Sequence, residues 1–204
     1  CGDNNLSNLD VSNNTQLTML YCSNNNLSSL DVSLNTLLTE LHCYRNQLAS
    51  LDVSNNTQLT VLVCYGNNLS SLDVSHNTQL TELDCSYNQL TALDVSHNTQ
   101  LTRLDCGKNN LISLDVSLNT LLTRLYCWGN NFTTAALDDI YCTLPDRTGK
   151  EYGVIFPLHD TSSVAEQAIV EATNASNATA KNWKVRKFRG FDDPDIATTG
   201  TYTC

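Results

Sequence analysis

Hydrophobic positions recur along residues 1–132 with a fixed period of 21 residues. A Leu-Asp-Val-Ser tetrad opens at the same point of each period, at Leu9, Leu30, Leu51, Leu72, Leu93 and Leu114. Cysteines keep the same interval, at Cys1, Cys22, Cys43, Cys64, Cys85, Cys106 and Cys127. A constant period of this length is typical of a solenoid, in which each repeat buries its apolar side against the next.

Each repeat contains a Leu-x-Cys triplet whose alternation has the two-residue period of a strand. In one such triplet we expect Leu20 and Cys22 to point inward and Tyr21 to point outward. Equivalent triplets are expected to stack as a parallel sheet. Two series of asparagines in the same register predict ladders that satisfy backbone groups at the corners. These are Asn25, Asn46, Asn67, Asn88, Asn109 and Asn130, and Asn14, Asn35, Asn56, Asn77, Asn98 and Asn119.

The full pattern, L-x-x-L-x-C-x-x-N-x-L followed by x-x-L-D-V-S-x-N-T, resembles the leucine-rich repeats. Over residues 1–132 it is similar to the bacterial 21-residue nested (IRREKO-type) subclass. The resemblance implies a Bacteroides-like secreted or surface protein that is used for binding. Because the Asn-, Ser- and Thr-rich second half has no helical periodicity, we expect a mainly β, weakly curved leucine-rich repeat solenoid.

The repeat pattern stops after Phe132, so we divide the chain into a solenoid of about six repeats over 1–132 and a capping region over 133–204. The solenoid begins in mid-repeat, and we interpret it as incomplete at its N-terminal end. In the capping region we expect a helix over 133–144, a strand over 152–158, helical segments within 162–180 and a strand over 183–188. Such an α/β cap would cover the open core of the last repeat.

The nine cysteines divide into two groups. Those in repeat register predict a column of buried, reduced thiols, because side chains of adjacent parallel strands rarely reach disulfide geometry. Cys142 and Cys204 lie outside the register, and the sequence leaves open whether they pair with each other. A disulfide between them would indicate an oxidising compartment.

The formal net charge of −10 argues against a nucleic-acid partner, because phosphate binding needs clustered Lys and Arg. No apolar stretch approaches the roughly 20 residues of a membrane span. The family resemblance implies a secreted or bacterial cell-surface location. A lipid anchor in sequence that precedes residue 1 is one way in which such a chain would be held at the surface.

Positions that vary between repeats are the candidates for ligand contact, because the framework residues stay constant. All the tyrosines of the repeats, their tryptophan and all their basic residues occupy these variable positions. Tyr, Trp and Arg are enriched at binding hot spots. We therefore select as binding candidates Tyr21, Tyr44, Tyr65, Asp84, Tyr87, Arg103, Arg124, Tyr126 and Trp128. We expect one group formed by Tyr44, Tyr65 and Tyr87, and another formed by Arg103, Arg124, Tyr126 and Trp128.

A structural interpretation competes with this one, since Tyr44 and Tyr65 are placed to stack on each other across neighbouring strands. The predicted function is non-enzymatic binding or adhesion, with a protein or peptide partner, including a host protein, at the sheet face. Carbohydrate binding and a rigid surface spacer are the alternatives. The chain carries no nucleophile motif, phosphate loop or zinc spacing, so we predict neither catalytic residues nor a cofactor.

The aspartates of the tetrads form a column of like charges about 4.8 Å apart. Hydrogen bonds from backbone amides or from neighbouring Ser and Thr residues would favour their ionised form. A bound calcium or other hard cation is the alternative. His76 and His97 hold equivalent positions in adjacent repeats, and we expect them to be surface residues and not metal ligands.

Overall fold

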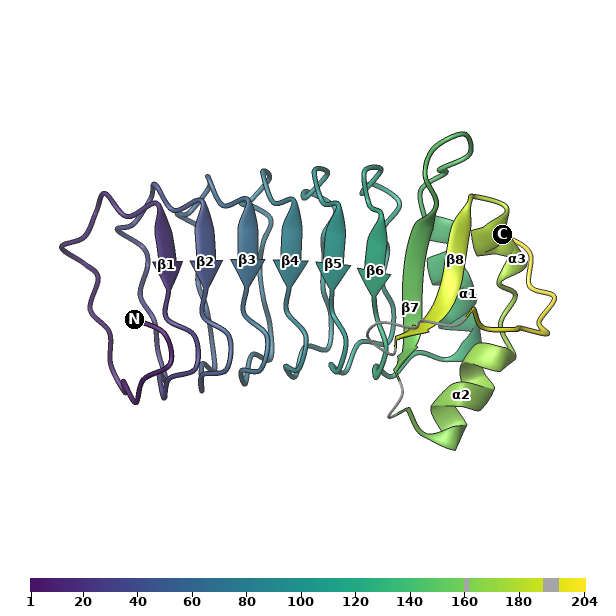
Figure 1. Ribbon diagram of the computed structural model, residues 1–204, viewed down its shortest axis with the longest axis horizontal. Helices are drawn as coiled ribbons and strands as arrows, with labels where there is room; N and C mark the ends of the chain where they lie inside the picture. The colour runs from purple at the N-terminus through teal and green to yellow at the C-terminus, as the bar shows by residue number, and fades with distance from the viewer. Residues whose placement is uncertain (160–161, 189–194) are drawn as a thin grey trace.

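The computed structural model describes residues 1–159, 162–188 and 195–204. The chain forms an elongated stack whose strands stand side by side in a nearly straight row (Figure 1). All eight strands belong to one parallel sheet in the order β1 to β8. The prediction of a mainly β, weakly curved leucine-rich repeat solenoid is confirmed.

Each repeat contributes one strand of three residues, and neighbouring strands pair at an offset of 21 residues. These strands are β1 (Met19–Tyr21), β2 (Glu40–His42), β3 (Val61–Val63), β4 (Glu82–Asp84), β5 (Arg103–Asp105) and β6 (Arg124–Tyr126). The central leucine of every strand is buried, as is the cysteine that follows it. In the first repeat Leu20 and Cys22 point inward, whereas Tyr21 is 45% exposed, as the alternation predicts.

The first asparagine ladder joins consecutive repeats through main-chain groups. The Asn46 amide donates to the carbonyls of Cys22 and Cys43, both at 3.1 Å, and its oxygen accepts from the Leu27 N–H at 3.0 Å. In the second ladder Asn56 donates to the Val32 carbonyl at 3.0 Å and to the Asn35 carbonyl at 2.9 Å. Both predicted ladders are thus present, and they satisfy backbone groups at the corners of the stack.

Beyond β6 the sheet continues into the C-terminal segment, which also supplies three helices. The elements are α1 (Thr134–Thr143), β7 (Gly153–His159), α2 (Val164–Glu171), α3 (Ser176–Thr179) and β8 (Trp183–Phe188). The predicted helix, strands and helical segments are therefore all found, with small shifts at their ends. The helices lie at the C-terminal end of the row of strands (Figure 1). Ile140, Tyr141, Ile155 and Trp183 extend the hydrophobic core of the repeats into this segment.

The thiols in repeat register are buried as predicted, except that of Cys1. Six of the seven cysteines in register are free and buried, and Cys1 is free and exposed. Cys142 and Cys204 form a disulfide that ties the C-terminal tail to the end of α1. Within the described residues, no helix combines the length and the apolar character that crossing a lipid bilayer requires.

Candidate functional site

The open side of the parallel sheet is built from the first and third residues of each short strand. Because the middle leucine of each strand is buried, its two neighbours point away from the core. We call this surface the sheet face. Its residues are Met19, Tyr21, Glu40, His42, Val61, Val63, Glu82, Asp84, Arg103, Asp105, Arg124 and Tyr126.

At the N-terminal end of the sheet face, Tyr21 is bound to the next repeat. Its hydroxyl donates a hydrogen bond to the Glu40 carboxylate, and this bond raises the pKa of Tyr21. The ring meets His42 edge-on, with centroids 4.7 Å apart. His42 Nε2 lies 3.8 Å from the same carboxylate. These contacts hold an exposed tyrosine ring in one position beside an acid and an imidazole.

The tyrosines just beyond the strands divide into two contacts and not one group. Tyr44 and Tyr65 stack with centroids 4.6 Å apart and planes 7° from parallel, and the Arg45 guanidinium lies 5.7 Å from the Tyr65 ring. Tyr87 instead meets Trp128 edge-on at 5.5 Å. The expected grouping of Tyr87 with the other two is therefore wrong. The stacking of Tyr44 on Tyr65 that the competing interpretation expected is observed.

Trp128 does not project from the molecule as the sequence led us to expect. Its side chain is only 4% exposed, with Tyr87 on one side and the His159 ring at 4.3 Å. The indole lies over Gly107, where an added Cβ would stand 2.8 Å from the ring. This residue follows the strand and turns back over the preceding repeat, so its ring packs within the protein.

The third residue after each of the strands β1 to β6 turns the chain at the corner of the repeat. Their φ angles are positive, a conformation that glycine adopts most readily. The series is Asn24, Arg45, Gly66, Tyr87, Lys108 and Gly129, with φ between 51° and 66°. Arg45, Tyr87 and Lys108 thus stand on the rim beside the sheet face and not on the strands themselves.

The centre of the sheet face holds three carboxylates around one arginine. Arg103 Nη1 lies 2.7 Å from Glu82 Oε1, and its Nη2 lies 3.7 Å from Asp105 Oδ2. Asp84 Oδ1 accepts from the Ser86 hydroxyl at 2.7 Å and from the Ser86 N–H at 3.1 Å. Burial raises the pKa of Asp84, and burial together with the neighbouring Asp84 raises that of Asp105 to about 7.

At its C-terminal end the sheet face becomes aromatic and basic. The Tyr126 ring stacks on Phe156 with centroids 4.5 Å apart, and Phe188 meets it edge-on at 5.4 Å. The Arg103 guanidinium lies 5.0 Å from the Tyr126 ring, and Arg124 is exposed beside it. The structure therefore brings together three of the four residues expected in the second group. Sequence reasoning missed Phe156 and Phe188 because neither lies in the repeat register, although both fall within predicted strands.

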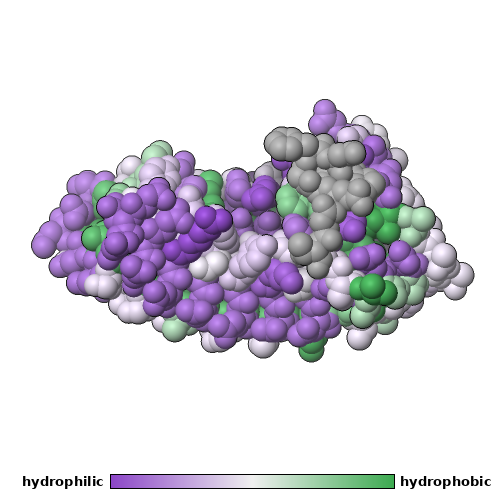
Figure 2. Space-filling view, turned by 60° about the horizontal axis from the view of Figure 1, so that its bottom comes forward, coloured by the Kyte–Doolittle hydropathy of each residue, from purple (hydrophilic) through white to green (hydrophobic). Residues whose placement is uncertain are grey.

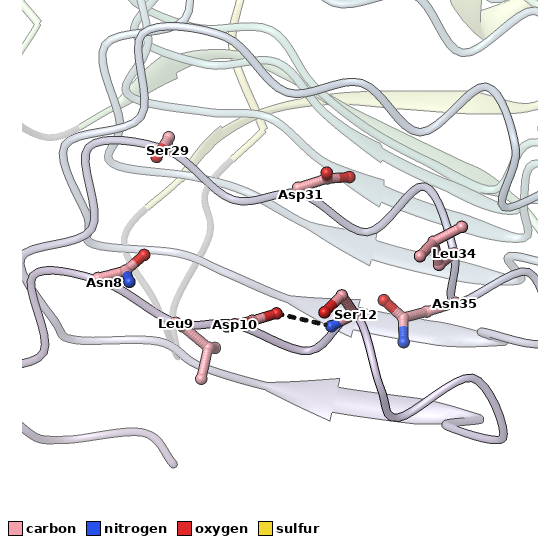
Figure 3. Close-up of a pocket in the computed structure, with 8 residues that line it drawn as sticks. All are labelled: Asn8, Leu9, Asp10, Ser12, Ser29, Asp31, Leu34 and Asn35. Atoms are coloured by element: carbon pink, nitrogen blue, oxygen red, sulfur yellow. Dashed lines mark hydrogen bonds between the residues drawn. The ribbon is translucent and has the colours of Figure 1, made fainter.

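The aspartate column lies away from the sheet face, in the second half of each repeat. Asp10 Oδ1 accepts a hydrogen bond from the Ser12 N–H at 2.9 Å (Figure 3). Asp31 and Asp52 accept the equivalent bond from Ser33 and Ser54, and the serines lower the pKa of all three aspartates. The local hydrogen bond predicted for these carboxylates is thus confirmed. Across the part of the chain that the structure describes, no group of three or more His, Cys, Asp or Glu residues is arranged to hold a metal ion.

His76 and His97 are exposed, and each lies 3.2 Å from the hydroxyl of the preceding serine.

The view from the lower side shows mainly hydrophilic residues with scattered apolar ones along the repeats (Figure 2). This side presents no single large apolar patch in that view.

Residues 57–97 match the family described as leucine-rich repeats in two copies. No curated protein matches the chain. Among solved structures, the chain resembles a leucine-rich repeat protein of Leptospira interrogans, with a TM-score of 0.66 and 26% identity over 70% of this chain and 40% of that one. It also resembles an internalin of Listeria monocytogenes, with a TM-score of 0.62 and 24% identity over 66% of this chain and 42% of that one.

A second Listeria monocytogenes protein, internalin C2, has a TM-score of 0.59 and 19% identity over 85% of this chain and 72% of its own. The present chain thus spans about two fifths of the first two proteins. The 21-residue register, the family match and these neighbours agree on the architecture. The chain has the solenoid fold of bacterial leucine-rich repeat proteins, and its residues 57–97 match the leucine-rich repeat family.

Proposed function

We propose that this chain is a non-enzymatic protein-binding module that recognises a protein or peptide through the sheet face. The observation that carries the proposal is a difference between two sets of positions in each repeat. Framework leucines, cysteines and asparagines are mostly buried and constant, whereas the sheet-face positions change from repeat to repeat and, apart from Val63, reach solvent. A rigid scaffold that displays variable side chains is suited to binding.

The succession of chemical zones along the sheet face favours a macromolecular ligand. A tyrosine with polar neighbours is followed by Val61 and Val63, then by the carboxylates around Arg103, and finally by Arg124 and Tyr126. A protein surface offers complementary apolar and charged groups over such a length, and aromatic residues and arginine supply the anchors. Tyr44, Tyr65 and Tyr87 widen this surface along its rim.

We further propose that the chain belongs to the 21-residue nested subclass and acts outside the cytoplasm, secreted or on a bacterial surface. The Cys142–Cys204 disulfide supports this location, because such bonds persist in oxidising compartments. The buried thiols are compatible with it, since the solenoid core shields them from oxidants. A host protein as partner and a lipid anchor as attachment are extensions of the same proposal.

The test is a screen of the chain against a displayed peptide library and a glycan array. A triple variant, Tyr21→Ala, Val61→Ser and Arg124→Ala, alters three zones of the sheet face. The matched control, Leu34→Ser, Ile112→Ser and Leu118→Ser, alters three exposed apolar residues outside the strands. Peptide binding that survives in the control and is lost in the triple variant supports the proposal.

Binding that survives in both variants would exclude the sheet face as the site. Binding to glycans alone would identify a carbohydrate-binding module, the first alternative. An absence of binders for a protein with an unchanged circular dichroism spectrum would favour the rigid spacer.

A further inference from the structure

A cavity opens where the last repeat meets the C-terminal segment, on the side of the sheet face. Its volume is about 650 Å³, and its walls come from β6, β7, β8 and the loop between α1 and β7. We call it the junction pocket. The residues that give it chemical character are Arg124, Tyr126, Arg147, Tyr152, Phe156 and Arg186.

Arg147 is the unusual member of this pocket. It is only 8% exposed, and two main-chain carbonyls hold it, that of Glu151 at 2.9 Å from Nε and that of Leu122 at 3.2 Å from Nη1. Among the described residues no carboxylate lies within ion-pair distance of its guanidinium. A buried charge without a counter-charge is unfavourable unless an anion is supplied from elsewhere.

The neighbouring groups add positive charge. Arg124 is exposed at the edge of the pocket and has no acidic partner among the described residues. Arg186 pairs with Asp195 at 2.8 Å, and Glu151 is the one acidic residue in the lining. Asp195 and Glu151 offset two of the three arginines, so the cavity keeps one positive charge in excess in a chain with a net charge of −10. Such a local reversal of charge attracts a negatively charged group.

The aromatic residues in the walls of the junction pocket limit which ligands fit it. Tyr126 and Phe156 use their ring faces on each other, and Lys184 covers the Tyr152 ring at 4.0 Å. Each of these three rings therefore has one face covered, and Phe188 also meets Tyr126 edge-on. Its polar lining combines the three guanidinium groups with the Glu151 carboxylate and the hydroxyls of Thr123, Tyr126 and Tyr152. Arg124 and Arg147 have no acidic partner among the described residues and lie beside these rings, which favours a carboxylate next to an apolar side chain as the ligand.

We propose that the junction pocket binds an Asp or Glu side chain of an acidic segment of the protein partner. Arg124 and Arg147 hold the carboxylate, and the edges of Tyr126 and Phe156 contact an apolar residue next to it. Guanidinium groups bind carboxylates in paired, charge-assisted hydrogen bonds, and Arg147 is already oriented for this by its two carbonyls. This inference rests on the proposed protein-binding function and names the anchor of that ligand.

The test uses small probes and heteronuclear NMR of the complete chain. Acetyl-Glu-Phe-amide is expected to shift the amide signals of Tyr126 and Phe156 in a saturable titration. Acetyl-Gln-Phe-amide is expected to bind about tenfold more weakly, because it lacks the charge. Arg124→Gln is expected to weaken the Glu probe by about the same factor. Lys108→Gln removes one charge at the rim outside the pocket and is the matched control, with no expected effect.

Equal binding of the Glu and Gln probes would overturn the carboxylate site, as would a Glu probe that leaves the amide signals unchanged. Tighter binding of N-acetylneuraminic acid or glucuronic acid than of the Glu probe would overturn the assignment to a peptide. The Arg147→Gln variant is titrated with the Glu probe only if its amide spectrum shows the native fold. Library peptides that bind the sheet face while the Glu probe fails would refute this anchor and leave the protein-binding function standing.

Discussion

At the scale of the residue, the cysteine of each repeat acts as a small apolar side chain. Burial raises the pKa of Cys22 to about 11 and that of Cys64 well above its usual range. Cys85 and Cys106 donate their S–H groups to strand carbonyls of the next repeat at 3.5 Å. Thiols in this environment stay protonated and unreactive, so their contribution is to packing.

Replacing Cys64 by serine tests this packing role. The hydroxyl is expected to lower the free energy of unfolding by about 2 kcal/mol, because it would be fully buried without an assured partner. Urea denaturation followed by circular dichroism measures the effect. Cys1→Ser is the control, since that thiol is exposed. Equal stability of Cys64→Ser and the parent would contradict a tightly packed thiol column.

Gly107 tests the packing of Trp128. Gly107→Ala places a Cβ 2.8 Å from the indole, so the ring has to move outward. We expect a loss of about 1–3 kcal/mol in the free energy of unfolding, as overpacking produces. In a Trp183→Phe background, Trp128 fluorescence should shift to longer wavelength as the ring meets water. Unchanged emission together with unchanged stability would show that the indole does not depend on this glycine.

At the scale of the element, parallel pairing sets equivalent residues of neighbouring strands side by side. This register brings Tyr21 to His42, Glu82 to Arg103, and Asp84 to Asp105. Parallel pairing places both attractive and repelling side chains next to each other, because the backbone imposes the spacing. The acidic pair is tolerated through Arg103 and through the hydrogen bonds that Asp84 receives from Ser86.

The acidic pair predicts a specific dependence of stability on pH. Asp105 loses its proton near its ordinary value of 3.8 when unfolded, but keeps it up to about pH 7 when folded. The folded state therefore binds more protons between these values, and the stability that Asp105 contributes is lost as the pH rises from about 4 to about 7. Above pH 7, Asp105→Asn is expected to be more stable than the parent by about 1 kcal/mol or more.

Urea denaturation from pH 4 to pH 8 measures this difference, which should shrink toward pH 4. Asp115→Asn removes an exposed carboxylate of the aspartate column and serves as the control. Stability curves for Asp105→Asn and the parent that run parallel across this range would refute the role of Asp105.

At the scale of the whole molecule, the C-terminal segment prolongs the sheet of the repeats and covers its end with helices (Figure 1). The tail is held against these helices by the Cys142–Cys204 disulfide. Tyr202 donates to Asp139 Oδ1 at 2.8 Å, and Gly200 donates to the Thr173 carbonyl at 2.9 Å. A repeat protein is stabilised by contacts between neighbours, so loss at one end is felt mainly there.

Removing the disulfide should therefore weaken the C-terminal segment more than the distant repeats. Cys204→Ser opens a link between residues 62 positions apart and is expected to reduce the stability of this segment by about 2–4 kcal/mol. Hydrogen exchange should show faster exchange in α1 and α3, with amides of β1 to β3 unchanged. Cys142→Ser should reproduce the result. Faster exchange over all the strands would instead indicate that the chain unfolds as one cooperative unit.

The sequence predicted the structure of the repeats more completely than that of the candidate site. The strand triplets, the buried cysteines and both asparagine ladders follow from the 21-residue register, because each is a property repeated at every turn of the solenoid. The side on which Trp128 lies does not follow from that register. Its burial depends on Gly107 and on His159, a residue outside the repeats.

The sequence by itself determined the stacked architecture, since a constant period permits only one register between neighbours. It also determined which positions vary between repeats and are therefore candidates for ligand contact. Tertiary structure alone decided how those side chains combine. The junction pocket joins Arg124 to Arg147 and Arg186, and no periodic pattern relates these residues. The physical reason is that the repeats contact only their neighbours, whereas the C-terminal segment folds back through non-local packing against the last repeat.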